Sequence, residues 1–225
     1  ECLTAIELAR LADAQAALAV MAAGLGKTIT VAFDIGHWLQ QRGGRVLYLC
    51  NQNDILDQAQ KKINDVLGQG VTHGFYYGHK KSPYKADCLY ASLQTLARHH
   101  TLFQPQEFSY IVVDETHHIP APTYEKVLRY FRPQFLLGVT ATPDRMDGLD
   151  VRKIFGEEVY NLPLEDALAR NLLTPVDYRL LTNEVDISRT QGLMLQPNVT
   201  VSALDDQLFV PRTDEEVAST IRQHA

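Results

Sequence analysis

The sequence has no long run of apolar residues. Hydrophobic residues make up 45% of its 225 residues, yet no stretch approaches the roughly 18 consecutive apolar residues of a membrane-spanning helix. The first residues also lack a basic segment followed by an apolar core, which is the pattern of a secretory signal peptide. We therefore expect a cytoplasmic protein that works without a membrane.

Cysteine is scarce, and its spacing is not that of a metal site or of a disulfide framework. Cys2, Cys50 and Cys88 are far apart and odd in number, and two of them sit in strand-like runs, so we expect reduced, buried thiols. The eight histidines occur in no Cys-x-x-Cys or His-Glu-x-x-His pattern. The sequence therefore predicts no structural zinc.

An excess of basic residues is also missing. The chain has 21 Lys and Arg residues against 27 Asp and Glu residues, which gives a net charge of −6. This balance argues against a protein that coats nucleic acid with one broad basic face. It leaves open a protein that grips a strand through a few loops, since backbone N–H groups and hydroxyls also contact phosphates.

Short apolar runs alternate with longer amphipathic segments. Strands are predicted at residues 17–22, 46–50, 110–114 and 135–139, and more weakly at 75–77 and 88–91, while 78–85 is predicted to be a polar loop with three lysines. Helices are predicted at 28–41, 54–67 and about 124–130, from apolar residues at helical spacing. Such alternation is typical of an α/β fold, a parallel sheet with helices on both faces and ligands at the carboxyl ends of its strands.

The pattern changes after about Gly148. Short helical stretches are expected within 149–174, an apolar run at 176–181, a polar and irregular extension at 183–212, and a final helix from Thr213, where a capping oxygen precedes acids. We therefore divide the chain into an α/β domain, residues 1–148, and a trailing segment, residues 149–225.

The stretch MAAGLGKTIT, residues 21–30, is similar to a phosphate-binding loop without its first glycine. The common pattern is G-x-x-x-x-G-K-[ST], and Met21 stands at the first glycine. A strand, a glycine-containing turn and a helix follow one another here, so backbone N–H groups would face phosphates. Lys27 would neutralise the β- and γ-phosphates, and the Thr28 hydroxyl would coordinate Mg²⁺. The alternative is a tight strand-to-helix turn with an exposed lysine.

Two carboxylates are adjacent in the sequence: Asp114 ends the predicted strand YIVVD, and Glu115 begins the next segment. In a parallel sheet this strand end shares one rim with the phosphate-binding loop. Asp114 could then hold Mg²⁺, and Glu115 could orient and deprotonate an attacking water. The alternative is an acidic pair that caps the following segment.

A third stretch, GVTATP at residues 138–143, delivers two small hydroxyls, Thr140 and Thr142, to the same rim. They could bond to the acidic pair or to His117, and so report the state of the phosphates. A simple strand-ending turn would give the same pattern.

Together these stretches resemble the superfamily 2 helicases and translocases. MAAGLGKT resembles their motif I, VVDETHH motif II of the DEAH/DExH branch, and VTATPDR motif III, while residues 47–59 and 90–98 look like motifs Ia and Ib. The phrase at residues 155–178 is most similar to the helicase portion of type I and type III restriction subunits. The resemblance covers about residues 1–182.

The resemblance implies a RecA-like ATP-binding domain and a role for each matching residue. ATP and Mg²⁺ would be held by Gly24, Leu25, Gly26, Lys27 and Thr28; Asp114 would bind the metal and Glu115 would activate water. His117, Thr140 and Thr142 would couple hydrolysis to strand binding. The nucleic-acid backbone would be contacted near Gln52, Ser92, Gln94 and Thr95.

Three positions depart from the family pattern. Ala23 replaces a common threonine, Thr116 a small residue, and Gln52 a frequent arginine; none removes a catalytic group. Motifs that the resemblance also implies are absent: an adenine-reading glutamine motif, which we expect just ahead of Glu1, and a second RecA-like domain with its arginines. A trans arginine contributes roughly three to five orders of magnitude in related hydrolases, so we expect this chain to be weakly active alone.

The function implied is ATP-dependent translocation on, or unwinding of, DNA (RNA fits less well) in restriction or repair. Restriction-modification or repair subunits would be partners, together with the second RecA-like domain. An alternative keeps ATP but drops the motor: a nucleotide-dependent clamp or sensor on nucleic acid. A P-loop metabolic kinase explains neither ETHH nor TATP, and no nuclease cluster stands out in these residues.

Overall fold

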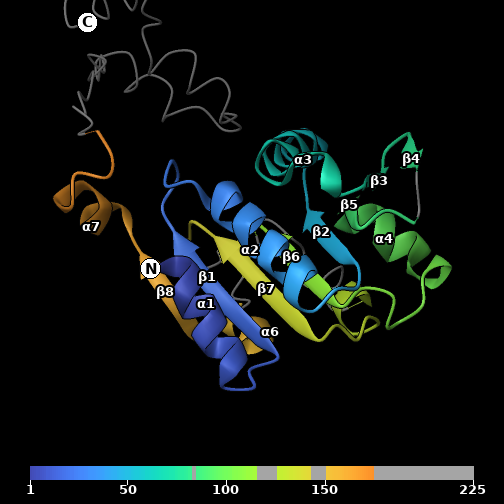
Figure 1. Ribbon diagram of the computed structural model, residues 1–225, viewed down its shortest axis with the longest axis horizontal. Coiled ribbons are helices and arrows are strands. Elements are labelled where there is room, and N and C mark those ends of the chain that lie inside the picture. Colours follow the sequence, from blue (N-terminus) through green and yellow to red (C-terminus); the bar gives the residue numbers. More distant parts are fainter. Residues whose placement is uncertain (83–84, 116–125, 143–150, 175–225) are drawn as a thin grey trace, which may run out of the picture. The chain divides into compact units, whose positions relative to one another are not determined.

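The computed structural model describes residues 1–82, 85–115, 126–142 and 151–174 (Figure 1). All of them fall within one compact unit, Glu1–Pro175. A second unit, Val176–Ala225, lies outside the described residues. The apolar run, the irregular extension and the final helix predicted there therefore stay predictions.

One sheet of eight strands organises the described chain, in the order β4-β3-β5-β2-β6-β7-β1-β8. The strands are β1 (Ala16–Met21), β2 (Val46–Cys50), β3 (His73–Tyr77), β4 (Lys80–Ser82), β5 (Cys88–Ser92), β6 (Tyr110–Asp114), β7 (Phe135–Thr140) and β8 (Glu158–Leu162). Every neighbouring pair is parallel except β3 with β4. The predicted α/β fold with a parallel sheet is confirmed, and the carboxyl ends of its parallel strands meet at one rim.

Helices cover both faces of this sheet. They are α1 (Cys2–Leu11), α2 (Lys27–Gln41), α3 (Asn53–Leu67), α4 (Leu93–His99), α6 (Arg152–Phe155) and α7 (Leu164–Ala169), with 3-10 turns η1 (Gly68–Gly70) and η2 (His100–Leu102). One buried cluster joins the sheet to α1, α2 and α3, and a second joins it to α4 and α6. In Figure 1, α1 and α2 lie in front of the strands and α6 lies behind them. Among the described helices, none has both the length and the hydropathy to span a membrane.

Two strands differ from the sequence prediction, which also gave no helix where α1 and α4 lie. The polar loop expected at 78–85 contains β4, which folds back on β3 as a hairpin; three polar residues carry no apolar signal. The sheet also continues past residue 148, because β8 pairs with β1 and the Ala22 N–H donates to the Leu162 carbonyl at 3.0 Å. The boundary placed at residue 148 therefore divides one sheet, and the compact unit runs to Pro175.

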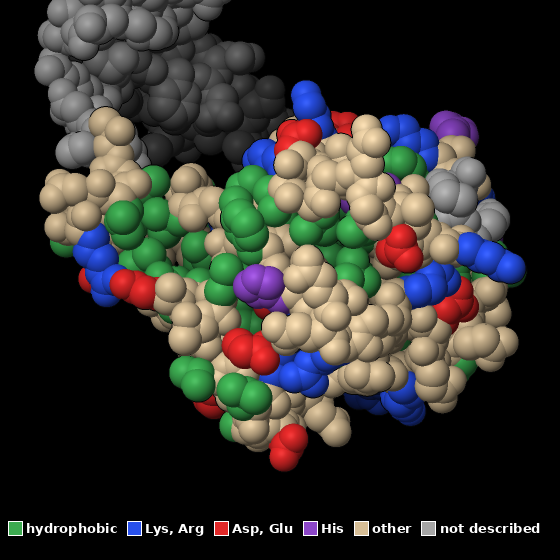
Figure 2. Space-filling model, viewed as in Figure 1, with side chains coloured by type: hydrophobic (Ala, Val, Ile, Leu, Met, Phe, Trp, Pro, Cys, Tyr) green, Lys and Arg blue, Asp and Glu red, His purple; other side chains and the backbone are tan. Residues whose placement is uncertain are grey.

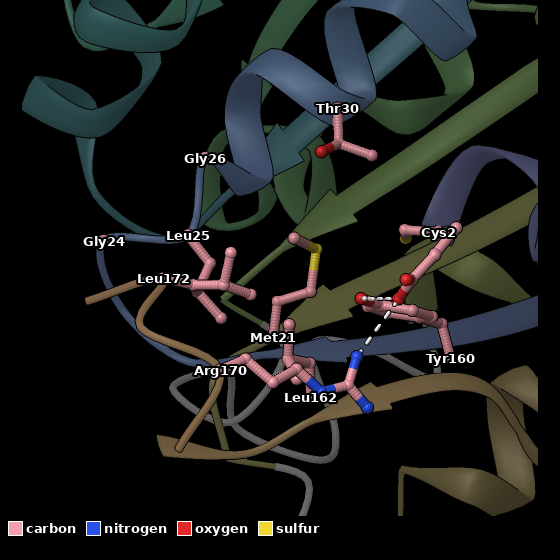
Figure 3. A pocket seen from close by; sticks show the side chains of 11 residues that line it. Cys2, Met21, Gly24, Leu25, Gly26, Thr30, Tyr160, Leu162, Arg170 and Leu172 are labelled. Carbon is pink, nitrogen blue, oxygen red and sulfur yellow. Dashed lines mark hydrogen bonds and ion pairs between the residues drawn. The ribbon is translucent and has the colours of Figure 1, made fainter. Parts of the chain in front are cut away.

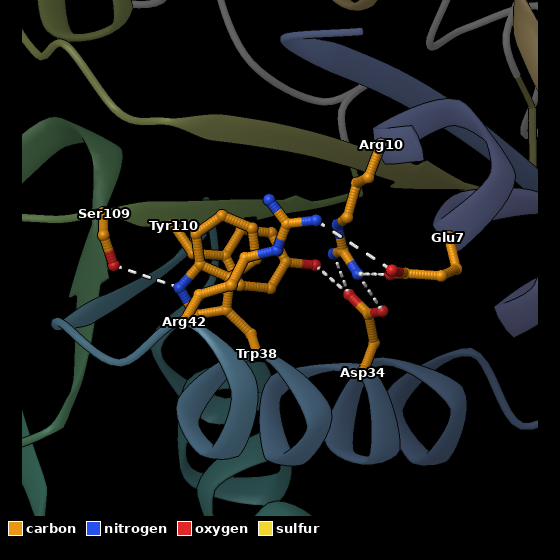
Figure 4. Close-up of polar contacts among 7 residues, drawn as sticks. All are labelled: Glu7, Arg10, Asp34, Trp38, Arg42, Ser109 and Tyr110. Atoms are coloured by element: carbon orange, nitrogen blue, oxygen red, sulfur yellow. Dashed lines mark hydrogen bonds and ion pairs between the residues drawn. The ribbon is translucent and has the colours of Figure 1, made fainter. Parts of the chain in front are cut away.

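A buried ion pair ties α1 to α2 (Figure 4). Arg10 donates from Nη1 and Nη2 to the two oxygens of Asp34 at 2.7 and 2.5 Å, and the Tyr110 hydroxyl donates to Asp34 at 2.5 Å. The guanidinium of Arg10 also lies 5.2 Å from the ring centre of Trp38, whose Nε1 donates to Ser109 Oγ at 3.0 Å. Because both charges are buried and paired, they hold α1 in place just before β1, the strand that leads to the predicted phosphate-binding loop.

Candidate functional site

Adjacent strands bring the three predicted stretches together on one rim. Val20 near the end of β1 pairs with Thr140 at the end of β7, and Val139 pairs with Asp114 at the end of β6. The loop after β1, the acidic pair and the threonines are therefore neighbours in space, although they are far apart in sequence.

The loop after β1 has the geometry of an anion-binding turn. Gly24 and Gly26 have φ angles of 86° and 81°, a left-handed conformation that favours glycine. Gly26 is the N-cap of α2, and among the described residues no side chain caps this helix end. The first N–H groups of a helix have no intrahelical partner, and the helix dipole makes this end positive. The turn therefore presents free N–H groups where a phosphate would lie.

The position of the missing glycine belongs to the strand. Met21 is the last residue of β1, its side chain is only 5% exposed, and its carbonyl oxygen accepts a bond from Lys27 Nζ at 3.3 Å. The turn itself starts after Ala22. A glycine at position 21 is therefore not needed for the turn to form.

Lys27 connects the turn to the acidic pair. Its Nζ lies 3.9 Å from Glu115 Oε1, and the two side chains are only 12% and 22% exposed. The ammonium group is thus held at the mouth of the turn between a carbonyl oxygen and a carboxylate. A phosphate group bound at the turn would meet Lys27 and lie next to Glu115.

Asp114 is buried and is held from two sides. Its Oδ2 accepts a hydrogen bond from the Tyr48 hydroxyl at 2.5 Å, and its Oδ1 accepts one from the Glu115 N–H at 3.0 Å. Burial, and secondarily the charge of Glu115, raise the pKa of Asp114, while the Tyr48 bond and the charge of Lys27 oppose that rise. Glu115 has a φ of 51°, so the chain turns sharply directly after β6.

Tyr48 was not predicted as a site residue. Burial, and then the charge of Asp114, raise the pKa of Tyr48, so its hydroxyl remains a neutral donor. The sequence does hold a weak signal, because a side chain with a polar tip in the apolar run VLYLC needs a buried partner. The sequence does not identify that partner as Asp114, which is in a different strand.

The residues predicted to couple hydrolysis to strand binding are only partly described. Thr140 is buried, and its Oγ1 donates to the Thr142 carbonyl at 2.9 Å and accepts from the Thr142 N–H at 3.2 Å. This pair forms a local turn at the end of β7. His117 and Thr116 lie outside the described residues, so the role expected for His117 stays a prediction.

The four residues predicted near nucleic acid lie at the ends of β2 and β5 and divide into two kinds. Gln52, the N-cap of α3, and Gln94 are exposed, and Gln94 Nε2 donates to the Asn51 side chain. Ser92 is buried, caps α4 by accepting the Thr95 N–H at 3.3 Å, and bonds to the Thr95 hydroxyl at 2.7 Å. The glutamines are therefore available to a ligand, while the two hydroxyls first serve the helix start.

A pocket of about 610 Å³ opens beside the turn (Figure 3). Its apolar wall includes Leu25, Leu162 and Leu172, and its polar wall includes Tyr160 and an ion pair of 3.2 Å between Arg170 and Glu1. The volume is in the range of small-molecule sites. The sequence prediction missed this pocket because β8 and residues 170–172 were assigned to the trailing segment.

The oxygen ligands at the rim suit a hard divalent cation. Thr28 is the second residue of α2 and Asp114 ends β6, so a hydroxyl and a carboxylate flank the place where the phosphates would bind. Mg²⁺ commonly takes one or two protein oxygens, with substrate phosphates and waters completing its shell. The residues present therefore fit this cation.

Comparison with known proteins gives a family match and a curated relative. Residues 1–145 match the sequence model of the family described as "Type III restriction enzyme, res subunit". The type I restriction enzyme EcoAI endonuclease subunit of Escherichia coli is 28% identical over 202 residues, which is 85% of this chain and 25% of that protein. This chain thus spans about a quarter of that relative's length.

Two solved structures share the fold. The ATP-dependent type ISP restriction-modification enzyme LlaBIII bound to DNA aligns with a TM-score of 0.59 and 17% identity, covering 77% of this chain and 16% of that one. A nuclease-deletion mutant of the type ISP enzyme LlaGI in complex with a DNA substrate mimic aligns with a TM-score of 0.57 and 18% identity, covering 76% and 20%.

Proposed function

Because the chain belongs to the type III restriction enzyme res-subunit family, we propose that it is the ATP-binding motor domain of a DNA helicase or translocase. The observation that carries the proposal is the contact between the phosphate-binding turn and the acidic pair, where Lys27 lies 3.9 Å from Glu115. The names of the relatives add restriction as the setting, and two of the similar structures are named as bound to DNA or a DNA mimic.

In this proposal, the turn and the acidic pair divide the work of ATP hydrolysis. The turn at Gly24 and Gly26 and the ammonium of Lys27 bind the β- and γ-phosphates. Thr28 and Asp114 hold Mg²⁺, which neutralises negative charge on the phosphates when it is bound. Glu115 accepts the proton of the attacking water.

The pocket beside the turn would receive the nucleoside end of ATP. It shares Gly24, Leu25 and Gly26 with the phosphate-binding turn, and it offers both apolar surface and the polar groups of Tyr160 and Arg170. A base needs both kinds of contact: apolar surface for its faces and polar groups for its edge.

The proposal includes a second RecA-like domain of the full-length protein, which would supply arginines across the cleft. The family resemblance supports it, and so does the length of the relative of which this chain covers about a quarter. Without those arginines we expect weak hydrolysis from this unit alone.

The direct test substitutes Lys27→Ala in the full-length protein and measures ATP hydrolysis with and without DNA. We expect DNA-stimulated hydrolysis to fall by about 100-fold or more, because one preorganised charge at transferring phosphates is worth that much. Lys153→Ala, an exposed lysine on α6, is the matched control and should hydrolyse ATP as the unsubstituted protein does. Unchanged hydrolysis in Lys27→Ala would refute the proposal.

A further inference from the structure

The β3–β4 hairpin lies at the same rim as the predicted nucleic-acid contacts. β3 runs parallel to β5, so its last residue, Tyr77, ends at the rim that Ser92 also reaches. The chain then turns at Gly78, whose φ is 51° and whose Cβ position would lie 3.6 Å from Asn53 Nδ2 at the start of α3. The hairpin turn is therefore next to Gln52.

This hairpin concentrates positive charge in an acidic chain. His79, Lys80 and Lys81 are consecutive and exposed, while the chain as a whole carries a charge of −6. In Figure 2, blue and purple side chains gather at the upper right, where Figure 1 places β3, β4 and the neighbouring α3. The overall composition of the chain is acidic, so it does not account for this local group of basic residues.

Both lysines lie over aromatic rings of β3. Lys80 Nζ lies 5.5 and 5.6 Å from the ring centres of Phe75 and Tyr77, and Lys81 Nζ lies 5.8 Å from that of Tyr76. Tyr76 and Tyr77 are 1% and 3% exposed, so these rings are part of the core. Successive residues of a strand point to opposite faces, and the two lysines therefore flank the edge of the sheet on both sides.

The acid that pairs with Lys80 is itself exposed. Asp57 of α3 accepts bonds from Lys80 Nζ at 2.6 Å and from the Tyr77 hydroxyl, and these contacts hold the pKa of Asp57 below its ordinary value. The Lys80 and Asp57 side chains are 54% and 44% exposed. An ion pair this exposed stabilises a protein by little, so an incoming phosphate can replace the carboxylate at small cost.

We propose that His79, Lys80 and Lys81 of the β3–β4 hairpin bind the phosphate backbone of a nucleic-acid strand that passes over the ends of β5 and β2. The proposal rests on the proposed motor function and adds a contact to it. Strands lie about 4.8 Å apart, so β3 to β2 spans about 10 Å, roughly three steps of 3.4 Å along the axis of a B-form duplex. β1 is five strands away, about 24 Å, which is too far for these cations to serve the ATP phosphates.

The test measures binding of the full-length protein to a fluorescein-labelled oligonucleotide, as duplex and as single strand, over a series of salt concentrations. We expect the affinity of the double variant Lys80→Ala/Lys81→Ala to be lower than that of the unsubstituted protein by about tenfold or more. The slope of log affinity against log salt concentration should be smaller in magnitude by about one to two. Each lost phosphate contact reduces that slope by about 0.9 for duplex and about 0.7 for single strand.

The matched control is Lys61→Ala/Lys62→Ala, an equal charge change on exposed residues of α3. These lysines lie about 12 Å along the helix from its start at the rim. The control should keep the original affinity and slope. Equal losses in both double variants would mean that net charge alone matters, and would overturn the proposal.

A second variant separates a phosphate contact from a structural anchor. Asp57→Asn removes the acid but leaves Lys80 in place, so affinity should stay the same or increase. If Lys80 only fastens the hairpin to α3, Asp57→Asn should weaken binding as much as the lysine variants do, which would contradict the proposal.

Lysines on an edge strand also protect against self-association. Unchanged nucleic-acid binding together with increased self-association in Lys80→Ala/Lys81→Ala would assign them that role and overturn the proposal. An unsubstituted protein that binds neither oligonucleotide would instead contradict the motor function on which the proposal rests.

Discussion

The surroundings of Asp114 act on its charge in opposite directions. It is 5% exposed and next to Glu115, and both facts favour its protonated form. The Tyr48 hydroxyl and the Glu115 N–H favour the carboxylate instead, because both donate to it. A metal ion bound at Asp114 would favour the carboxylate form further, because its positive charge stabilises a negative one.

This balance predicts that Asp114→Asn stabilises the protein at neutral pH while it abolishes hydrolysis. Folding raises the pKa of Asp114 above its ordinary 3.8, so the native state binds more protons than the unfolded state between those two values. Stability of the unsubstituted protein therefore declines as pH rises through that window. Each pH unit between the two pKa values corresponds to about 1.4 kcal/mol.

Chemical denaturation at a series of pH values checks this prediction. The advantage of Asp114→Asn should grow as pH rises above 3.8 and should vanish below that pH, where the aspartate is neutral in both states. Glu157→Gln, an exposed acid at the amino end of β8, is the control and should show no such advantage. A variant less stable than the original at pH 7 would refute this interpretation of Asp114.

The residues of the site differ in how far the sequence predicts them. Lys27, Asp114 and Glu115 could be predicted because each is part of a short stretch whose chemistry is local. Tyr48 and the Arg10–Asp34 pair could not, since their partners come from segments whose pairing only the folded sheet decides. Spacing along one chain carries no information on which buried donor meets which buried acceptor.

At the scale of elements, α4 shows that one motif serves two purposes. Ser92 caps the helix by accepting the Thr95 N–H, whereas Gln94, two residues further on, is exposed and bonds to Asn51. A motif read only as a nucleic-acid contact would merge these roles. The structure assigns the first to helix formation and leaves the second open to a ligand.

A pair of variants separates these roles. Ser92→Ala should lower the free energy of unfolding by about 1 kcal/mol, the usual cost of losing an N-cap. Gln94→Ala should leave stability unchanged, because the side chain is exposed, and should weaken binding to DNA under the proposed function. Urea unfolding and oligonucleotide titration measure the two effects, and the opposite assignment of effects would contradict this account.

The strands that the sequence prediction missed share a physical cause. β4 is three polar residues long, and only β3 beside it makes it a strand. β8 is an edge strand with partly exposed residues that pairs with the first strand of the sheet, far away in sequence. The strands that were predicted, such as β2 and β6, are buried along their whole length and show it in their composition.

At the scale of the whole described unit, the parallel sheet brings the residues of the candidate site together at one rim. Its register places the ends of β1, β6 and β7 together, where we propose that ATP binds, and the ends of β2, β5 and β3 together, where we propose that a nucleic-acid strand passes. The two groups share one rim, because β2 pairs with β6. Under the proposed function, changes at the phosphates would reach the strand-binding end through neighbouring strands and the loops after them.

The central claim, that this rim binds ATP and hydrolyses it, is tested most directly by Glu115→Gln in the full-length protein. Nucleotide binding should remain near that of the unsubstituted protein, since Lys27 and the turn are intact, while DNA-stimulated hydrolysis should fall by about 100-fold or more through loss of the general base. Glu157→Gln should hydrolyse ATP normally. Retained hydrolysis in Glu115→Gln, with ATP bound as before, would contradict the account.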